Sequence, residues 1–134
     1  MLYTIFTDGA SRGNPGPAAI GAIVYDTKKK VIFELSECIG KATNNVAEYT
    51  ALIKALECCN TLHDFTQVKI YLDSQLVVRQ LQGSYRVKEE HLKNLHSKVV
   101  QLLLEKRVSC EFVHVMREKN KIADALANKA LDAC

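Results

Sequence analysis

The chain has 134 residues, a formal net charge of +3, 48% hydrophobic residues and 25% charged residues. These values are ordinary for a soluble globular protein of one domain, residues 1–134, and no run of about 18 apolar residues could span a membrane. The chain starts without the basic leader and apolar core of a signal peptide, so we expect a cytoplasmic protein and, by default, a monomer. The mild overall charge does not by itself indicate a nucleic-acid partner.

Positive charge gathers in residues 79–107, which hold seven basic and three acidic residues. This local excess of positive charge is typical either of a phosphate-facing surface or of an ordinary solvated helix face.

Five cysteines show no CxxC pair and no Cys/His cluster with zinc spacing. We therefore predict that all five are reduced thiols. Cys58 and Cys59 are expected to be small buried side chains on a helix, and Cys134 is expected to have no role.

The first third of the chain predicts three strands. Leu2 to Thr7 is an apolar and β-branched run that ends at Asp8 and Gly9, and Ala18 to Tyr25 and Val31 to Cys38 follow as two more strands. Short turns between them predict an antiparallel meander.

The rest of the chain alternates helices with two further strands. Thr43, Asn44 and Asn45 carry side-chain oxygens that suit the cap of a helix. The expected elements are a helix from about Val46 to Cys59, a strand over 68–72 that ends at Asp73, a short helix to about Gln82, a longer helix after Gly83 and Ser84, a strand over 108–115, and a helix from about Asn120. This order predicts an α/β domain with a mixed five-stranded sheet, in which ligands gather at the carboxyl ends of the parallel strands.

Four acidic residues stand where predicted strands end or helices begin: Asp8, Glu48, Asp73 and Asp124. Asp8 and Asp73 end strands that can pair in parallel, because the helix between them supplies the crossover. Taken singly, Asp8, Asp73 and Asp124 also suit ordinary turns or helix starts. Glu48 lies on the apolar side of its helix without a nearby cation, and burying such a carboxylate is costly.

Together the four acids predict a site for Mg²⁺ or Mn²⁺, since hard oxygen ligands suit these ions. Two ions would balance four negative charges, and a two-metal site suits phosphodiester hydrolysis.

At these residues the sequence resembles the type 1 ribonuclease H family over essentially its whole length. The resemblance rests on four blocks in the family's order and spacing: Thr7-Asp8-Gly9-Ala10-Ser11 with Gly13-Asn14-Pro15-Gly16, Thr43-Asn44-Asn45-Val46-Ala47-Glu48, Asp73-Ser74-Gln75, and Ala123-Asp124-Ala125-Leu126-Ala127. It implies a ribonuclease H-like fold and a metal-dependent endonuclease that cuts the RNA strand of RNA/DNA hybrids, leaving a 5′-phosphate and a 3′-hydroxyl. Asp8, Glu48, Asp73 and Asp124 match the family's catalytic acids.

The resemblance also implies substrate contacts. Asn14, Asn45 and Gln75 match positions that read the RNA strand through its minor groove, where 2′-hydroxyls are displayed. Thr43 and Asn44 either help to hold a phosphate of the DNA strand or simply cap the helix.

Two departures from the family pattern stand out. The loop before Asp124 lacks the histidine of many members, and Arg117 is the nearest cation, which either takes the place of the histidine or is an ordinary surface charge. The basic insertion of better-known bacterial members is absent, since residues 83–88 alone occupy its place. We expect weaker, more salt-sensitive binding and a short form like those of some archaea and bacteria.

Other functions remain open from sequence. Proofreading-type 3′ to 5′ exonucleases share the architecture, but their usual second acid and His or Tyr positions hold Ala10, Lys119 and Asn120 here. A non-catalytic module that binds hybrids or double-stranded RNA is the other alternative, and activity on double-stranded RNA also stays open.

Overall fold

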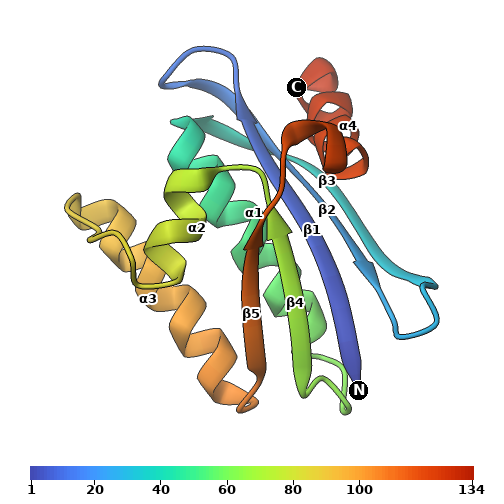
Figure 1. Cartoon of the computed structure of the whole chain (residues 1–134). Helices are drawn as coiled ribbons and strands as arrows, with labels where there is room; N and C mark the ends of the chain where they lie inside the picture. Colours follow the sequence, from blue (N-terminus) through green and yellow to red (C-terminus); the bar gives the residue numbers. More distant parts are fainter.

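Five strands form one mixed sheet with the order β3-β2-β1-β4-β5 (Figure 1). The computed structural model describes residues 1–134. Antiparallel pairing joins β1 to β2 and β2 to β3, whereas β4 pairs in parallel with both β1 and β5. The strands are β1 (Leu2–Ser11), β2 (Gly16–Tyr25), β3 (Val31–Ala42), β4 (Gln67–Leu72) and β5 (Ser109–His114).

Helices cover the two faces of the sheet unequally. Three of them lie on one face, and α4 lies alone on the other, near the carboxyl end of β1 (Figure 1). The helices are α1 (Asn44–Cys59), α2 (Gln75–Leu81), α3 (Glu90–Glu105) and α4 (Lys121–Ala133), with a short 3₁₀ helix, η1 (Arg117–Lys119), before α4. None of these helices is both long enough and apolar enough to cross a lipid bilayer.

The main hydrophobic core lies between the sheet and α1 to α3. Nineteen buried residues form this cluster, among them Ile5, Leu52, Ile70 and Val99. The inward face of α1 is the apolar stripe predicted from sequence, and Glu48 is the one carboxylate on it. Burial of this continuous apolar surface stabilises the frame that carries the acidic residues.

The predicted fold class and element order are confirmed, and the differences concern boundaries. The first strand does not end at Asp8 and Gly9 as predicted but continues to Ser11, because its pairing with β2 extends to Ala18. The third strand extends to Ala42 rather than Cys38, because pairing with β2 continues through an irregularity between Ala18 and Ala19. The longer helix starts at Glu90, well after Gly83.

The prediction that all cysteines are reduced is wrong for two of them. Cys38 on β3 and Cys134, directly after α4, form a disulfide with a Cα–Cα distance of 6.0 Å. The packing of α4 against β2 and β3 brings these two residues together although they are 96 positions apart. Cys58, Cys59 and Cys110 are free, and burial raises the pKa of the Cys59 and Cys110 thiols to about 12.

Candidate metal site and nucleic-acid surface

Asp8 and Glu48 are brought together by a close approach of β1 to α1. Gly9 follows Asp8, and a Cβ atom on Gly9 would lie 2.3 Å from the backbone carbon of Ala47. Only glycine permits this contact, which places the start of α1 directly against the strand. The amide of Gly9 then donates a hydrogen bond to Oε1 of Glu48 at 3.1 Å.

Asp73 reaches the same place because β4 runs parallel to β1. Phe6 and Tyr71 form the last pair of the parallel ladder, so Asp8 and Asp73, each two positions later, lie side by side just beyond it, although β1 itself continues to Ser11 along β2. Ser74 caps α2 through a bond from the amide of Val77, which ends the strand there.

Asp124 enters from the opposite face of the sheet. Gly21 pairs with Asp8 across β1 and β2, and a Cβ atom on Gly21 would lie 2.2 Å from the carbonyl oxygen of Ala123. The backbone of α4 therefore rests on β2 beside Asp8 and carries Asp124 with it. Asn128, one turn later, donates to the carboxylate of Asp124 at 3.2 Å.

The four predicted acids thus line one cavity, which we call the acid cleft. Carboxylate oxygens of Asp8, Glu48 and Asp73 lie within 4.8 Å of one another, while Asp124 lines the cleft outside that closest group. The cavity has a volume of about 470 Å³, and Arg117 is the only basic residue among those that line it.

The protonation of the acid cleft reflects burial and mutual repulsion. Burial raises the pKa of Asp8 to about 7, and the neighbouring charge of Asp73 acts in the same direction. Burial, together with the charge of Asp8, raises the pKa of Glu48 well above its ordinary value. Both effects penalise the charged form of a carboxyl group that has no cation beside it.

A divalent cation fits this arrangement. None of the four acids forms an ion pair with a basic side chain. Oε2 of Glu48 is buried and has no hydrogen-bond partner, although most buried polar atoms in proteins have one. The donor set of carboxylate and amide oxygens is that preferred by Mg²⁺ and Mn²⁺.

The predicted substrate residues fall into two groups. Asn44, Asn45 and Arg117 line the acid cleft, whereas Asn14, Thr43 and Gln75 lie outside its lining. Thr43 caps α1 by accepting from the amide of Val46 at 3.2 Å, and Oδ1 of Asn14 accepts from the amide of Asn44 at 3.0 Å. Gln75 is exposed at the first position of α2.

A second groove of about 490 Å³ shares Asn45 with the acid cleft. Tyr85, Arg86 and Lys88 line it together with the acidic Glu89. Two basic side chains beside an exposed ring give this groove the chemistry of a phosphate-backbone contact.

One buried side chain of the site escaped the sequence reasoning. Asn120, only 1% exposed, donates from Nδ2 to the carbonyl of Thr7 at 2.9 Å and to Oδ2 of Asp73 at 3.3 Å. It ties the start of α4 to the ends of both β1 and β4. In the sequence, the one indication of this role is that Asn120 is a polar residue one turn before Asp124, and a polar residue at that position is equally typical of an ordinary helix start.

The sheet order, with carboxylates on β1 and directly after β4, defines the class of ribonuclease H-like folds. Comparisons with known proteins agree. A family model described as reverse transcriptase-like matches residues 6–130. The solved structure of LC11-RNase H1, isolated from compost, superimposes with a TM-score of 0.92 and 47% identity, covering 98% of this chain and 96% of that chain. The chain belongs to the ribonuclease H family, in its type 1 branch.

Two curated relatives are longer than this chain, which covers only part of each. A ribonuclease HI of Halobacterium salinarum is 42% identical over 127 residues, which are 95% of this chain and 63% of that protein. A bifunctional protein of Mycobacterium tuberculosis, Rv2228c, is 42% identical over 135 aligned positions, which are 99% of this chain and 36% of that protein. The chain therefore spans between about one third and two thirds of the length of these relatives.

Proposed function

We propose that this chain is a metal-dependent endonuclease that hydrolyses the RNA strand of RNA/DNA hybrids. The observation that carries the proposal is the group of three carboxylates within 4.8 Å, in a cleft without a paired cation. A second support is LC11-RNase H1 in complex with an RNA/DNA hybrid, which is 46% identical to this chain with a TM-score of 0.93.

The acid cleft suits hydrolysis of a phosphodiester. Asp8, Glu48, Asp73 and Asp124 would hold two Mg²⁺ or Mn²⁺ ions, which when bound supply an activated water and stabilise the leaving oxygen. We propose that the products carry a 5′-phosphate and a 3′-hydroxyl. Asn120 and Asn128 hold Asp73 and Asp124 in place by hydrogen bonds, so the carboxylates need little rearrangement before the reaction.

The two strands of a hybrid would occupy two adjoining surfaces. Asn45 stands between the acid cleft and the second groove, and we assign it to the minor groove of the hybrid, together with Asn14 and Gln75 on the RNA strand. Arg86 and Lys88 in the second groove would contact phosphates of the DNA strand.

Arg117 is the basic residue that lines the acid cleft, and we assign to it a contact with the scissile phosphate or with the cleaved product. Its position supports this role over that of an ordinary surface charge. We assign Thr43 to the cap of α1. Asn44 lines the acid cleft, and we assign to it a contact with a phosphate of the DNA strand.

A direct test compares labelled RNA/DNA hybrid, duplex RNA and duplex DNA, each with Mg²⁺ and with EDTA. We expect internal cuts in the RNA of the hybrid that depend on the metal. Stepwise shortening from the 3′ end would instead indicate an exonuclease, and binding without cleavage would indicate a non-catalytic module. The duplex RNA arm decides whether double-stranded RNA is also a substrate. The monomeric state and the cytoplasmic location stay predictions.

The variant Asp73→Asn keeps the shape of the side chain and removes its charge. We expect cleavage to fall by about 10³-fold or more, since a lost metal interaction is worth several kcal/mol at the transition state. Folding should be intact or improved, because repulsion within the acid cleft is relieved. Asp132→Asn, an exposed acid on α4, serves as the matched control and should cleave normally. Normal cleavage by Asp73→Asn would contradict the metal assignment.

A further inference from the structure

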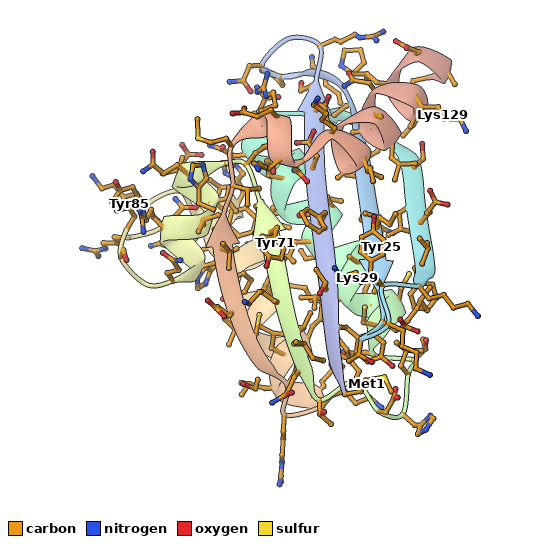
Figure 2. All side chains as sticks on the ribbon, turned by 45° about the vertical axis from the view of Figure 1, so that its right-hand side comes forward. Met1, Tyr25, Lys29, Tyr71, Tyr85 and Lys129 are labelled. Atoms are coloured by element: carbon orange, nitrogen blue, oxygen red, sulfur yellow. A yellow bond between two sulfur atoms is a disulfide. The ribbon has the colours of Figure 1, made fainter.

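The face of the sheet that carries α4 is only partly covered. Below α4, side chains of Phe6, Tyr25 and Tyr71 project from β1, β2 and β4, and Figure 2 shows Tyr25 and Tyr71 on this open face. The rings of Phe6 and Tyr71 are stacked with centroids 4.7 Å apart, and the ring of Tyr25 meets Phe6 edge-on at 6.3 Å. Each of the three side chains is only half-buried.

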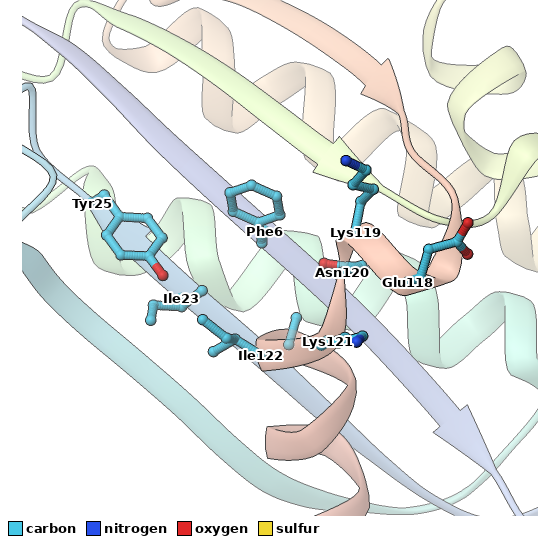
Figure 3. Close-up of a pocket in the computed structure, with 9 residues that line it drawn as sticks. Phe6, Ile23, Tyr25, Glu118, Lys119, Asn120, Lys121 and Ile122 are labelled. Carbon is cyan, nitrogen blue, oxygen red and sulfur yellow. The ribbon is translucent and has the colours of Figure 1, made fainter.

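These rings line two adjoining hollows. One has a volume of about 480 Å³ and is lined by the three rings with Thr4 and Lys29. The other, about 200 Å³, shares Phe6 and Tyr25 and continues to the start of α4, where Ile122 forms its wall (Figure 3). We call the two hollows together the aromatic groove.

The charges of the aromatic groove are mostly positive. Lys29, Lys119 and Lys121 line it, and Glu118 is the only acidic residue that does so. Lys29 lies in the turn between β2 and β3 with a φ of 63°, and Figure 2 shows it between Tyr25 and Tyr71. A set of half-buried rings with exposed lysines beside them complements a polyanion that has flat apolar groups.

The aromatic groove adjoins the acid cleft. Phe6 and Asp8 lie on the same face of β1 two residues apart, which corresponds to about 7 Å. The segment η1 separates the two sites, since Arg117 lines the acid cleft while Glu118 and Lys119 line the aromatic groove. A chain that leaves the acid cleft over η1 would therefore reach the rings directly.

We propose that the aromatic groove binds an unpaired, single-stranded extension of the RNA strand that is held in the acid cleft. Bases would stack on Phe6, Tyr25 and Tyr71, and phosphates would contact the lysines at the rim. This inference rests on the proposed function. A single strand fits better than an acidic peptide, because the groove is continuous with a surface already assigned to nucleic acid.

The test measures binding of blunt hybrids and of hybrids with a ten-nucleotide RNA extension at the 5′ or the 3′ end, in EDTA so that no cleavage occurs. We expect one of the two extensions to tighten binding by about tenfold, as expected for one or two stacked bases. The double variant Tyr25→Leu/Tyr71→Leu should lose this gain while cleaving blunt hybrid at the normal rate in Mg²⁺. Equal affinity for blunt and extended hybrids in the native chain would overturn the proposal.

Charge variants provide a second, independent readout. Lys29→Gln should lose part of the gain from the extension, whereas Lys129→Gln, on the solvent side of α4, should keep all of it (Figure 2). These variants decide the question even if the double tyrosine variant folds poorly. Retention of the full gain in Lys29→Gln would count against the groove.

Two other occupants are outcomes of the same series. A peptide of acidic and aromatic residues that binds through Tyr25 and Tyr71, while the RNA extension does not, would assign the groove to a protein partner and overturn the proposal. Self-association that is lost in the double tyrosine variant would assign it to a second copy of this chain and overturn it equally. If the native chain cleaves no hybrid at all, the proposed function fails, whereas the gain from the extension still decides the groove.

Discussion

Two carboxyl groups near opposite ends of β1, those of Asp64 and Asp8, have pKa values that are shifted in opposite directions. At the start of the strand, the hydroxyl of Tyr3 donates to Oδ1 of Asp64 at 2.5 Å, and the amino group of Met1 bonds to Thr66 at 2.9 Å. This hydrogen bond from Tyr3 lowers the pKa of Asp64 and raises that of Tyr3 to about 12. At the other end, burial without a cation raises the pKa of Asp8 to about 7.

The hydrogen-bonded groups near Tyr3 serve the fold alone, whereas the carboxylates around Asp8 form a site that is suited to a ligand. Polar groups at the first end satisfy one another, so they need nothing from outside the chain. Carboxylates at the second end repel one another and leave an oxygen of Glu48 without a partner. Such a site lowers the stability of the metal-free fold, and the binding of a cation restores that stability.

The largest effect on stability is expected from pH in the metal-free protein. The pKa of Asp8 is about 7 in the fold against 3.8 ordinarily, so between these values the folded chain holds a proton that the unfolded chain has lost. The stabilising contribution is therefore complete below about pH 4 and disappears as the pH rises through 7. A difference of this size corresponds to about 4 kcal/mol.

Urea denaturation from pH 4 to 8 in EDTA measures this contribution. Asp8→Asn should reduce the pH dependence and leave the part that comes from buried Glu48, whose pKa is also raised, and Mg²⁺ should restore the stability of the native chain at pH 8. A metal-free stability that rises over this range would show that Asp8 does not lie in the environment described here.

The next effect concerns the attachment of α4, whose first turns carry Asp124. The disulfide joins Cys38 to Cys134 across 96 positions, and constraining such a long loop stabilises a fold typically by about 2–4 kcal/mol. Cys134→Ser should therefore lower the melting temperature. A reducing agent should destabilise the native chain but not the variant, and Cys58→Ser, a free thiol, should behave like the native chain.

The sequence predicted the four acids of the site, but not the disulfide or the aromatic groove around it. Asp8 and Asp73 follow apolar runs that are joined by a helical crossover, and parallel pairing of those runs places the two carboxylates side by side. The disulfide escaped prediction because it depends on how α4 lies against β3, which no local pattern encodes. The aromatic groove escaped as well, since Phe6, Tyr25 and Tyr71 are ordinary strand residues until it is known where α4 lies on the sheet.

A smaller effect on stability, with an effect on rate, is expected at Asn120. Asn120→Ala removes the bonds to Thr7 and Asp73, and the loss of a buried hydrogen-bonding group costs about 1–3 kcal/mol. Cleavage should also slow, because Asp73 loses its support. Asn60→Ala is the matched control, since Asn60 donates to the carbonyl of Leu102 at 2.9 Å, far along α1 from the acid cleft.

Denaturation curves and cleavage rates of the two asparagine variants separate the roles. A similar loss of stability in both, with slow cleavage in Asn120→Ala alone, would assign Asn120 a positioning role. Equal cleavage by the two variants would reduce it to a structural residue.

The smallest effect is expected at the closed end of β1. Tyr3→Phe removes the hydrogen bond to Asp64 but keeps the ring, which packs against Phe65 with centroids 5.7 Å apart. We expect a melting temperature only slightly below that of the native chain and an unchanged cleavage rate, because neither Tyr3 nor Asp64 lines the acid cleft. Calorimetry and the hybrid cleavage assay measure the two quantities on the same sample. A change in cleavage rate would mean that the two ends of β1 are coupled, and the division between a closing end and a ligand-binding end would then be wrong.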